Sequence, residues 1–235
     1  MCTVSFVATK DGFVITSNRD EQVIRAAIVP SKYQINNQNL FFPKDPAAGG
    51  TWYAVNENGN VLVLLNGAAE KHQHKPPYIK SRGLLVLDMI SNQNPILLWD
   101  NIDLTGIEPF TLVLFQDLKL HQLQWNETIK SALVLDVSKP HIWSSSTLYD
   151  AENRKIRAQW FFESLLLKND FNANDLMHFH KNTHTENKEN GLIINRNNQL
   201  KTLSITQSVI TKNTINMIYN DLLTKKNTTL SIDIQ

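Results

Sequence analysis

The chain has 235 residues, of which 42% are hydrophobic, so a single domain over residues 1–235 can bury a sizeable core. Its formal net charge of +1 argues against a dedicated nucleic-acid binder, because phosphate recognition needs a strong basic excess. No apolar run approaches the ~18 residues of a membrane helix, and no early segment has the pattern of a signal peptide. One cysteine excludes an internal disulfide and suits a reducing compartment, so we expect a cytoplasmic protein.

The first predicted hairpin places the single cysteine opposite a charged segment. Residues 2–9 and 13–20 have the alternation of two strands, and residues 10–12 have the composition of a tight turn. Antiparallel pairing around this turn puts Cys2 opposite residues 18–21. The hairpin therefore brings polar side chains to the only thiol of the chain.

Cys2 directly follows Met1, and this position suggests a chemical role. Removal of Met1 would leave a thiol and a free α-amine on one residue, and the amine can accept the thiol proton. Arg19 can stabilise the thiolate, and Asp20 or Glu21 can pair with the ammonium, although alternation lets only alternate residues share a face. The alternative is a small, partly buried cysteine beside a solvated hairpin end.

A second predicted hairpin ends in another candidate. Residues 51–56 and 61–66 predict strands, and an Asn-Gly pair within 57–60 predicts the turn between them. The second strand is apolar on both faces, which is typical of a strand buried on both sides. Asn66 ends this strand just before Gly67 and can donate to an oxyanion; its alternative role is to cap the strand end.

The remaining pattern predicts further strands with helices between them. Residues 22–48 contain three prolines and predict a loop with short strands. Ser81 caps a predicted helix that ends at Ile90. Further elements are expected as strands at 110–116, 119–126, 132–138, 191–197, 199–206 and 215–222, and as helices at 151–168 and 171–180. Hairpins at both ends with helices between them favour an α+β fold with two antiparallel sheets.

The helix predicted at 151–168 is amphipathic. Its expected apolar stripe consists of Ile156, Trp160, Phe161, Leu165 and Leu166. Its expected polar side carries Arg154, Lys155 and Arg157. We therefore expect the three cations to face solvent.

Four motifs in order resemble the NRDE family: MCT at 1–3, SNRDE at 17–21, GGTW at 49–52 and LLNG at 64–67. This family includes the transport and Golgi organisation protein 2 group. It is similar to the N-terminal nucleophile hydrolases of the choloylglycine hydrolase and penicillin V acylase type. The resemblance implies a four-layer αββα sandwich with two mainly antiparallel sheets.

The resemblance also implies roles for four residues. Cys2 would be the nucleophile after loss of Met1, Arg19 would stabilise its thiolate, and Asp20 would orient the α-amine. Asn66 would donate to the oxyanion. The acylases have the spacing Arg-x-x-Asp, whereas Arg19 and Asp20 are adjacent here.

Two later positions also differ from the related sequences. Ser146 stands where related proteins have an asparagine, and His184 stands where they have an arginine between two threonines. The acylase site contains a late arginine for which the sequence shows no clear counterpart. The missing late arginine and the adjacency of Arg19 and Asp20 favour the alternative, a non-catalytic carrier or chaperone for a hydrophobic small molecule such as haem or an acyl derivative.

The single cysteine at position 2 favours an enzyme instead. We expect an N-terminal nucleophile amidohydrolase that cleaves a small N-acyl amide through a thioester on Cys2. If Trp52 and Tyr53 line its pocket, they favour an apolar acyl group. The sequence has no phosphate-binding loop, and we expect no cofactor.

Two histidine pairs are weak metal candidates. His72 and His74, and also His178 and His180, have ligand-like spacing but no accompanying cysteine or carboxylate pattern. We expect all four to be exposed loop histidines and predict no metal site.

Overall fold

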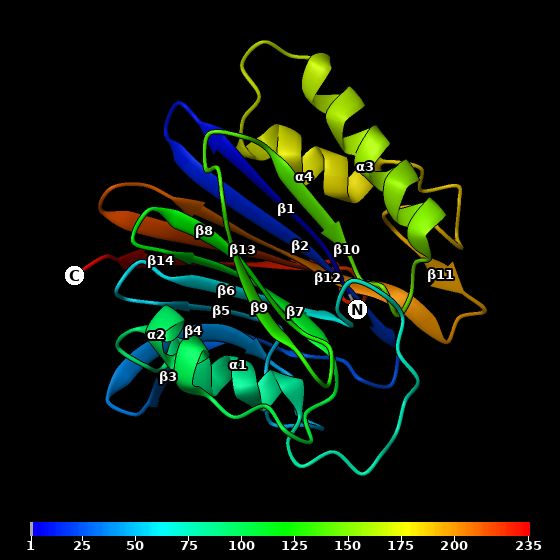
Figure 1. Cartoon of the computed structure of the whole chain (residues 1–235). Helices are drawn as coiled ribbons and strands as arrows, with labels where there is room; N and C mark the ends of the chain where they lie inside the picture. The colour runs from blue at the N-terminus through cyan, green and yellow to red at the C-terminus, as the bar shows by residue number, and fades with distance from the viewer. Residues whose placement is uncertain (1) are drawn as a thin grey trace.

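The computed structural model describes residues 2–235, apart from the side chain of Cys2. In this part of the chain, two antiparallel seven-stranded sheets pack face to face, with helices on both outer faces (Figure 1). Helices α3 (Ala151–Leu166) and α4 (Ala173–Asn182) cover one sheet, and α1 (Arg82–Ile90) and α2 (Pro95–Asn101) cover the other. The predicted α+β, αββα architecture is confirmed. None of the described helices is long and apolar enough to cross a membrane.

Each sheet has its own strand order. The first sheet is ordered β10 (His141–Ser144), β1 (Cys2–Thr9), β2 (Gly12–Gln22), β12 (Leu200–Ile210), β13 (Thr214–Asp221) and β14 (Lys226–Asp233), with β11 (Asn195–Arg196) paired to β12. The second sheet is ordered β3 (Ile28–Ile35), β4 (Gln38–Lys44), β5 (Tyr53–Asn56), β6 (Val61–Asn66), β7 (Phe110–Gln116), β8 (Lys119–Trp125) and β9 (Lys130–Leu135).

The register of β1 and β2 decides what each strand position faces. Cys2 pairs with Arg19, so the predicted position of Cys2 opposite residues 18–21 is confirmed. Val4 and Phe6 pack into the core between the sheets, whereas Val7 packs under the outer helices. By alternation, Arg19 faces the space between the sheets and Asp20 faces the helix layer.

The hairpin of β5 and β6 is also confirmed. Gly59 adopts a φ of +80° in the turn, which an L side chain rarely adopts. The Asn56 side chain accepts hydrogen bonds from the backbone N–H groups of Asn58 and Asn60, which fixes the turn. All six residues of β6 are buried, since this strand lies between β5 and β7 with the other sheet on one face and α1 on the other.

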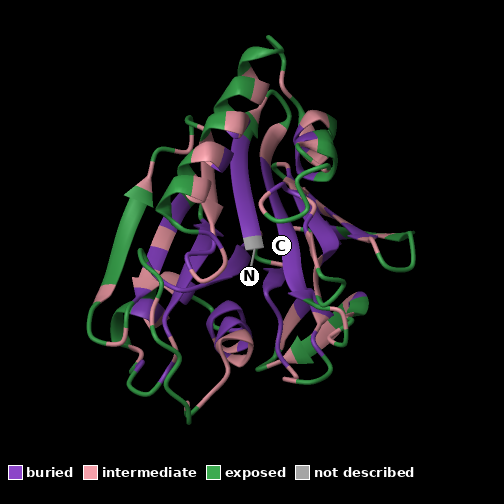
Figure 2. Cartoon of the chain, turned by 90° about the vertical axis from the view of Figure 1, so that its right-hand side faces the viewer, coloured by how far each residue is buried: buried purple, intermediate pink, exposed green. Residues whose placement is uncertain are grey.

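Several elements differ from the prediction. Within the segment 22–48, where a loop with short strands was expected, β3 and β4 pair as an antiparallel hairpin whose register shifts between Ile28 and Ser31. Helix α2 and strands β10 and β14 were not predicted, and only Asn195–Arg196 of the strand predicted at 191–197 is a strand. Figure 2 shows why patterns differ among elements: the central strands are buried, whereas peripheral elements are largely exposed.

The predicted faces of α3 are partly wrong. Arg157 is 1% exposed, although it was expected on the polar side, and Leu166 is 86% exposed, although it was expected in the apolar stripe. Phe161 is buried as predicted. Arg157 lies four residues before Phe161 and therefore on the same helix face, so it enters the interior with it.

Candidate functional site

Arg19 is a buried cation at the position paired with Cys2. Its side chain is 4% exposed, and its guanidinium lies 4.1 Å from the centre of the Trp52 ring. Its Nη1 donates to the carbonyl of Arg25 at 2.7 Å, and its Nη2 lies 3.4 Å from Asp45 Oδ2. The Cys2 side chain lies outside the described residues. What the structure places is the Cys2 backbone, directly opposite a fixed positive charge.

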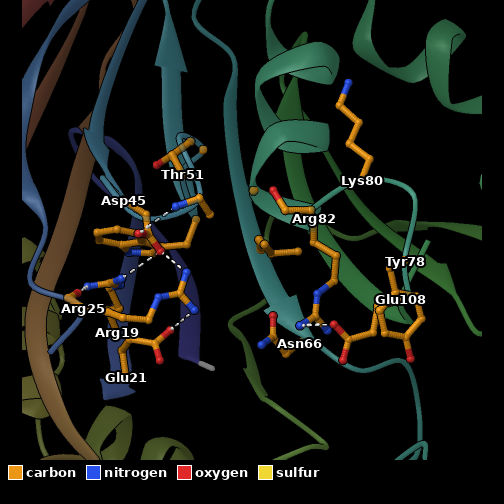
Figure 3. Close-up of a pocket in the computed structure, with 16 residues that line it drawn as sticks. Arg19, Glu21, Arg25, Asp45, Thr51, Asn66, Tyr78, Lys80, Arg82 and Glu108 are labelled. Carbon is orange, nitrogen blue, oxygen red and sulfur yellow. Dashed lines mark hydrogen bonds and ion pairs between the residues drawn. The ribbon is translucent and has the colours of Figure 1, made fainter. Parts of the chain in front are cut away.

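A pocket of about 350 Å³ lies beside this point, and both Arg19 and Asn66 line it (Figure 3). Its walls come from the end of β2, the loop before β5, the end of β6 and the start of α1. Four cationic and three anionic side chains line it, namely Arg19, Arg25, Lys80, Arg82, Glu21, Asp45 and Glu108. The cavity is therefore small and contains many charged side chains of both signs.

Trp52 lines this pocket but Tyr53 does not. Tyr53 is fully buried, and its hydroxyl donates to the carbonyl of Ile15 at 3.1 Å. Burial raises the pKa of the Tyr53 hydroxyl well above its ordinary value, so the hydroxyl stays protonated. The condition under which the two aromatics would favour an apolar acyl group, that they line the pocket, is therefore met by Trp52 and not by Tyr53.

Asn66 presents a free amide at the end of β6. It is 9% exposed, and none of the described residues hydrogen-bonds to its side-chain amide. Its backbone carbonyl accepts a hydrogen bond from Ser145 Oγ at 2.7 Å, which anchors the residue from behind. The amide is thus held at the pocket wall with donors available for a ligand.

Ser146 supports the turn that follows Asn66. Its Oγ donates to the carbonyl of Glu70 at 3.0 Å, and it would lie 2.2 Å from a Cβ placed on Gly67. Gly67 has a φ of +82°, so both conformation and space require glycine there. Ser146 does not line the pocket that contains Asn66. It packs against Gly67 and so supports the turn that follows β6.

Asp20 lies on the other side of the sheet. Its carboxylate is fully buried and accepts hydrogen bonds from Tyr149 Oη at 2.7 Å and Thr202 Oγ1 at 2.6 Å. It follows the partner of Cys2 by one residue but does not line the pocket. The structure therefore brings Arg19 and Asn66 together and separates Asp20 from them.

A second buried arginine belongs to the Asp20 side. The guanidinium of Arg157 lies 3.5 Å from the centre of the Tyr149 ring, donates to the carbonyl of Asn190 at 3.1 Å, and also hydrogen-bonds to Thr3 Oγ1. Burial, and secondly the charge of Asp20, raise the pKa of Tyr149 well above its ordinary value, so its hydroxyl stays a donor. The i, i+4 spacing to Phe161 is the sequence signal that could have identified Arg157 as inward-facing.

Arg82 lies on the pocket wall across from Arg19 (Figure 3). Its Nη2 lies 2.7 Å from Glu108 Oε2, and its Nη1 donates to the carbonyl of Pro109 at 2.9 Å. Burial raises the pKa of Glu108, but Arg82 and two histidines outweigh that effect, so the pKa is below its usual value and the carboxylate is charged. Sequence reasoning missed both residues.

The histidines expected to be exposed fall into two groups. His74 and His178 are exposed, whereas His72 is mostly buried against Glu108 and His180 is fully buried. The prediction is therefore wrong for His72 and His180. Across the described residues, no group of three or more His, Cys, Asp or Glu side chains is arranged to hold a metal ion.

A contact between two glycines positions Arg82. A Cβ on Gly50 would lie 2.3 Å from the backbone carbon of Gly83, and Thr51 N–H donates to the Gly83 carbonyl at 3.1 Å. The loop before β5 therefore abuts the first turn of α1, where Arg82 begins the helix. This contact gives the GGTW segment a physical role in building the pocket.

His184 is remote from this pocket. It is exposed, its ring lies 4.0 Å from that of Trp160, and its Nδ1 lies 3.0 Å from Glu186. It is not among the residues that line the pocket.

Comparisons with known proteins agree with the fold. The family model described as Transport and Golgi organisation 2 matches residues 1–234. The C2A mutant of the conjugated bile acid hydrolase from Clostridium perfringens matches with a TM-score of 0.63 at 12% identity, covering 99% of this chain and 92% of that one. The N-acylethanolamine-hydrolyzing acid amidase ortholog from Caenorhabditis elegans matches with a TM-score of 0.62 at 11% identity, covering 88% and 92%. At these identities the likeness is one of fold. No curated protein matches the sequence significantly.

Proposed function

Because this chain belongs to the Transport and Golgi organisation 2 family and has the fold of N-terminal nucleophile hydrolases, we propose that it is an N-terminal cysteine amidohydrolase. Its substrate is a small N-acyl amide. The observation that carries the proposal is the free amide of Asn66 in the pocket that Arg19 lines, where Arg19 is the partner of Cys2. We place the activity in the cytoplasm, since a single thiol suits a reducing compartment.

The proposed reaction begins with loss of Met1. The α-amine of Cys2 accepts the thiol proton, and Arg19 stabilises the resulting thiolate by its charge. The thiolate attacks the amide carbon, and the Asn66 amide donates to the oxyanion that forms. The departing amine takes a proton from the ammonium of Cys2, and water then hydrolyses the thioester to release the acid.

Asp20 has an indirect part in this proposal. It immediately follows Arg19, and its two oxygens are fixed by Tyr149 and Thr202. In the proposed reaction this carboxylate on β2, next to the end of β1, orients the α-amine from the helix side. Arg157 supports the same region through Thr3 and Tyr149.

Hydrolysis assays of two variants test the proposal. Cys2→Ala is expected to abolish turnover of small amides while it keeps ligand binding. Asn66→Ala is expected to lower kcat by roughly a hundredfold, about 2.7 kcal/mol, with little change in affinity, because the donor acts on charge that develops in the transition state. Specific ligand binding without turnover of any amide, together with normal cellular function of Cys2→Ala, would instead support a carrier.

A further inference from the structure

The Arg82 side of the pocket has donors that none of the described residues uses. Arg82 is 14% exposed, and its contacts with the described residues engage only Nη1 and Nη2. A guanidinium has five N–H donors, and its Nε has no hydrogen-bond partner among the described residues. A ligand in the pocket can therefore still bind this cation.

The counter-charge of Arg82 is shared. Glu108 directs Oε2 to Arg82, while its Oε1 lies 3.1 Å from both His72 Nε2 and His74 Nδ1. The Glu108 carboxylate thus contacts three basic side chains, so its negative charge is shared among them. Arg82 can therefore still bind a second anionic group. Its planar fork matches a carboxylate, which it can bind with two parallel hydrogen bonds.

The pocket also limits the size of the ligand. A volume of about 350 Å³ is at the lower end of the ~300–1,000 Å³ range of ligand pockets. Its seven charged side chains favour a ligand that carries a charged group. Arg82 and Asn66 point into the same space (Figure 3), so a group bound by Arg82 would lie close to the proposed reacting carbonyl.

We propose that Arg82 is a specificity-determining residue that binds a carboxylate of the substrate, so that the protein selects small amides carrying a carboxylate near the scissile bond. This inference rests on the proposed function. The carboxylate can belong to the amine portion, as in an N-acyl amino acid, or to the acyl portion, as in the monoamide of a dicarboxylic acid.

Matched ligands test the inference. Binding of N-acetylalanine, of its carboxamide and of succinamic acid is measured by calorimetry on protein carrying Cys2→Ala, which cannot turn them over. Either N-acetylalanine or succinamic acid is expected to bind at least about tenfold more tightly than the carboxamide. The ligand that does so shows whether Arg82 binds a carboxylate of the amine portion or of the acyl portion of the substrate. Adding Arg82→Gln is expected to remove most of this preference, whereas Lys139→Gln, the same charge change at an exposed site, is expected to keep it.

Arg82→Lys provides a second comparison if Arg82→Gln does not fold. It keeps the charge but loses the planar fork, so we expect the preference to fall by about threefold or more. Equal binding of carboxylates and carboxamide, or a preference that both Arg82 variants retain, would overturn the inference. Turnover of amides without a carboxylate preference would overturn it while the amidohydrolase stands. An Arg82-dependent preference without any turnover would support it and count against the amidohydrolase.

Discussion

Arg19 and Asp20 are consecutive residues of β2, so their side chains leave opposite faces of the sheet. Arg19 enters the pocket between the sheets, and Asp20 enters the helix layer, where Tyr149 and Thr202 hold it. The spacing Arg-x-x-Asp of the acylases is therefore not reproduced here. In this chain the two charges lie on opposite faces of the sheet, next to the end of β1.

His180 forms a buried polar group that resembles a catalytic triad in geometry only. Its Nε2 lies 2.6 Å from Ser5 Oγ, and its Nδ1 lies 2.7 Å from Asn18 Oδ1. All three residues are fully buried, so no substrate reaches them. Their role is to join α4 to β1 and β2.

This burial makes stability depend on pH. Burial, and secondly the charge of Arg157, lower the pKa of His180 to about 3, against about 6.5 in an unfolded chain. The neutral histidine therefore contributes stability that is fully present above pH ~6.5 and is lost towards pH ~3. We expect the free energy of unfolding to fall by about 1.4 kcal/mol per pH unit below pH ~6.5 through this residue alone.

Urea unfolding of His180→Gln measures this contribution. The variant is expected to be less stable at pH 7 but to show a flatter decline between pH 6.5 and 4.5. His178→Gln is the matched control, because His178 is exposed two residues earlier on the same helix. An unchanged slope in His180→Gln would show that His180 is not the group that titrates.

At the scale of elements, the loop before β5 and the start of α1 are joined through Gly50 and Gly83. A side chain at position 50 would meet backbone rather than a flexible side chain, so the two elements would have to separate. Gly50→Ala is expected to lower stability by about 1–3 kcal/mol and to raise KM, because Arg82 moves with α1. Kinetics and thermal unfolding check both effects.

Gly59→Ala is the control for this prediction. Gly59 has a positive φ of +80°, which is not the case for Gly50. A Cβ on Gly59 would meet only the Ile234 side chain, at 3.4 Å. This variant should lose stability through backbone strain and keep its KM. If Gly50→Ala leaves KM at the wild-type value, the glycine contact does not position the pocket.

An element was predicted correctly where its sequence signal is local and strong. The hairpins of β1–β2 and β5–β6 were predicted because turn residues and alternation are local. Strands β10 and β14 lie at sheet edges and are partly exposed, so their residues show weak hydrophobic patterning. The inward face of α3 was mispredicted because the buried Arg157 is compensated by the carbonyls of Asn190 and Gly191, which are remote in sequence, and by the Tyr149 ring just before the helix.

At the scale of the whole molecule, the pocket is a product of tertiary structure. Arg19 and Asn66 were predicted because each lies within a recognisable motif at or near the end of a strand. Arg82 and Glu108 were not, because no local pattern marks them, and they meet only when α1 packs on the second sheet. Sequence thus identified the side of the pocket next to Cys2 and missed the opposite wall.

The sandwich as a whole gives Cys2 its proposed chemistry. Its backbone is fixed in the first sheet, whereas Asn66 belongs to the second, so the nucleophile and the oxyanion donor come from opposite layers. The central claim is that a free N-terminal cysteine becomes acylated in the pocket between these layers. That claim concerns covalent structure and can be read directly from mass.

The intact mass of untagged protein, before and after brief reaction with a small N-acyl amide and acid quenching, tests this claim. We predict a chain that begins at Cys2 and gains the mass of one acyl group on its N-terminal peptide, with no gain in Cys2→Ala. A chain that retains Met1 and gains no acyl group with any amide would contradict the account.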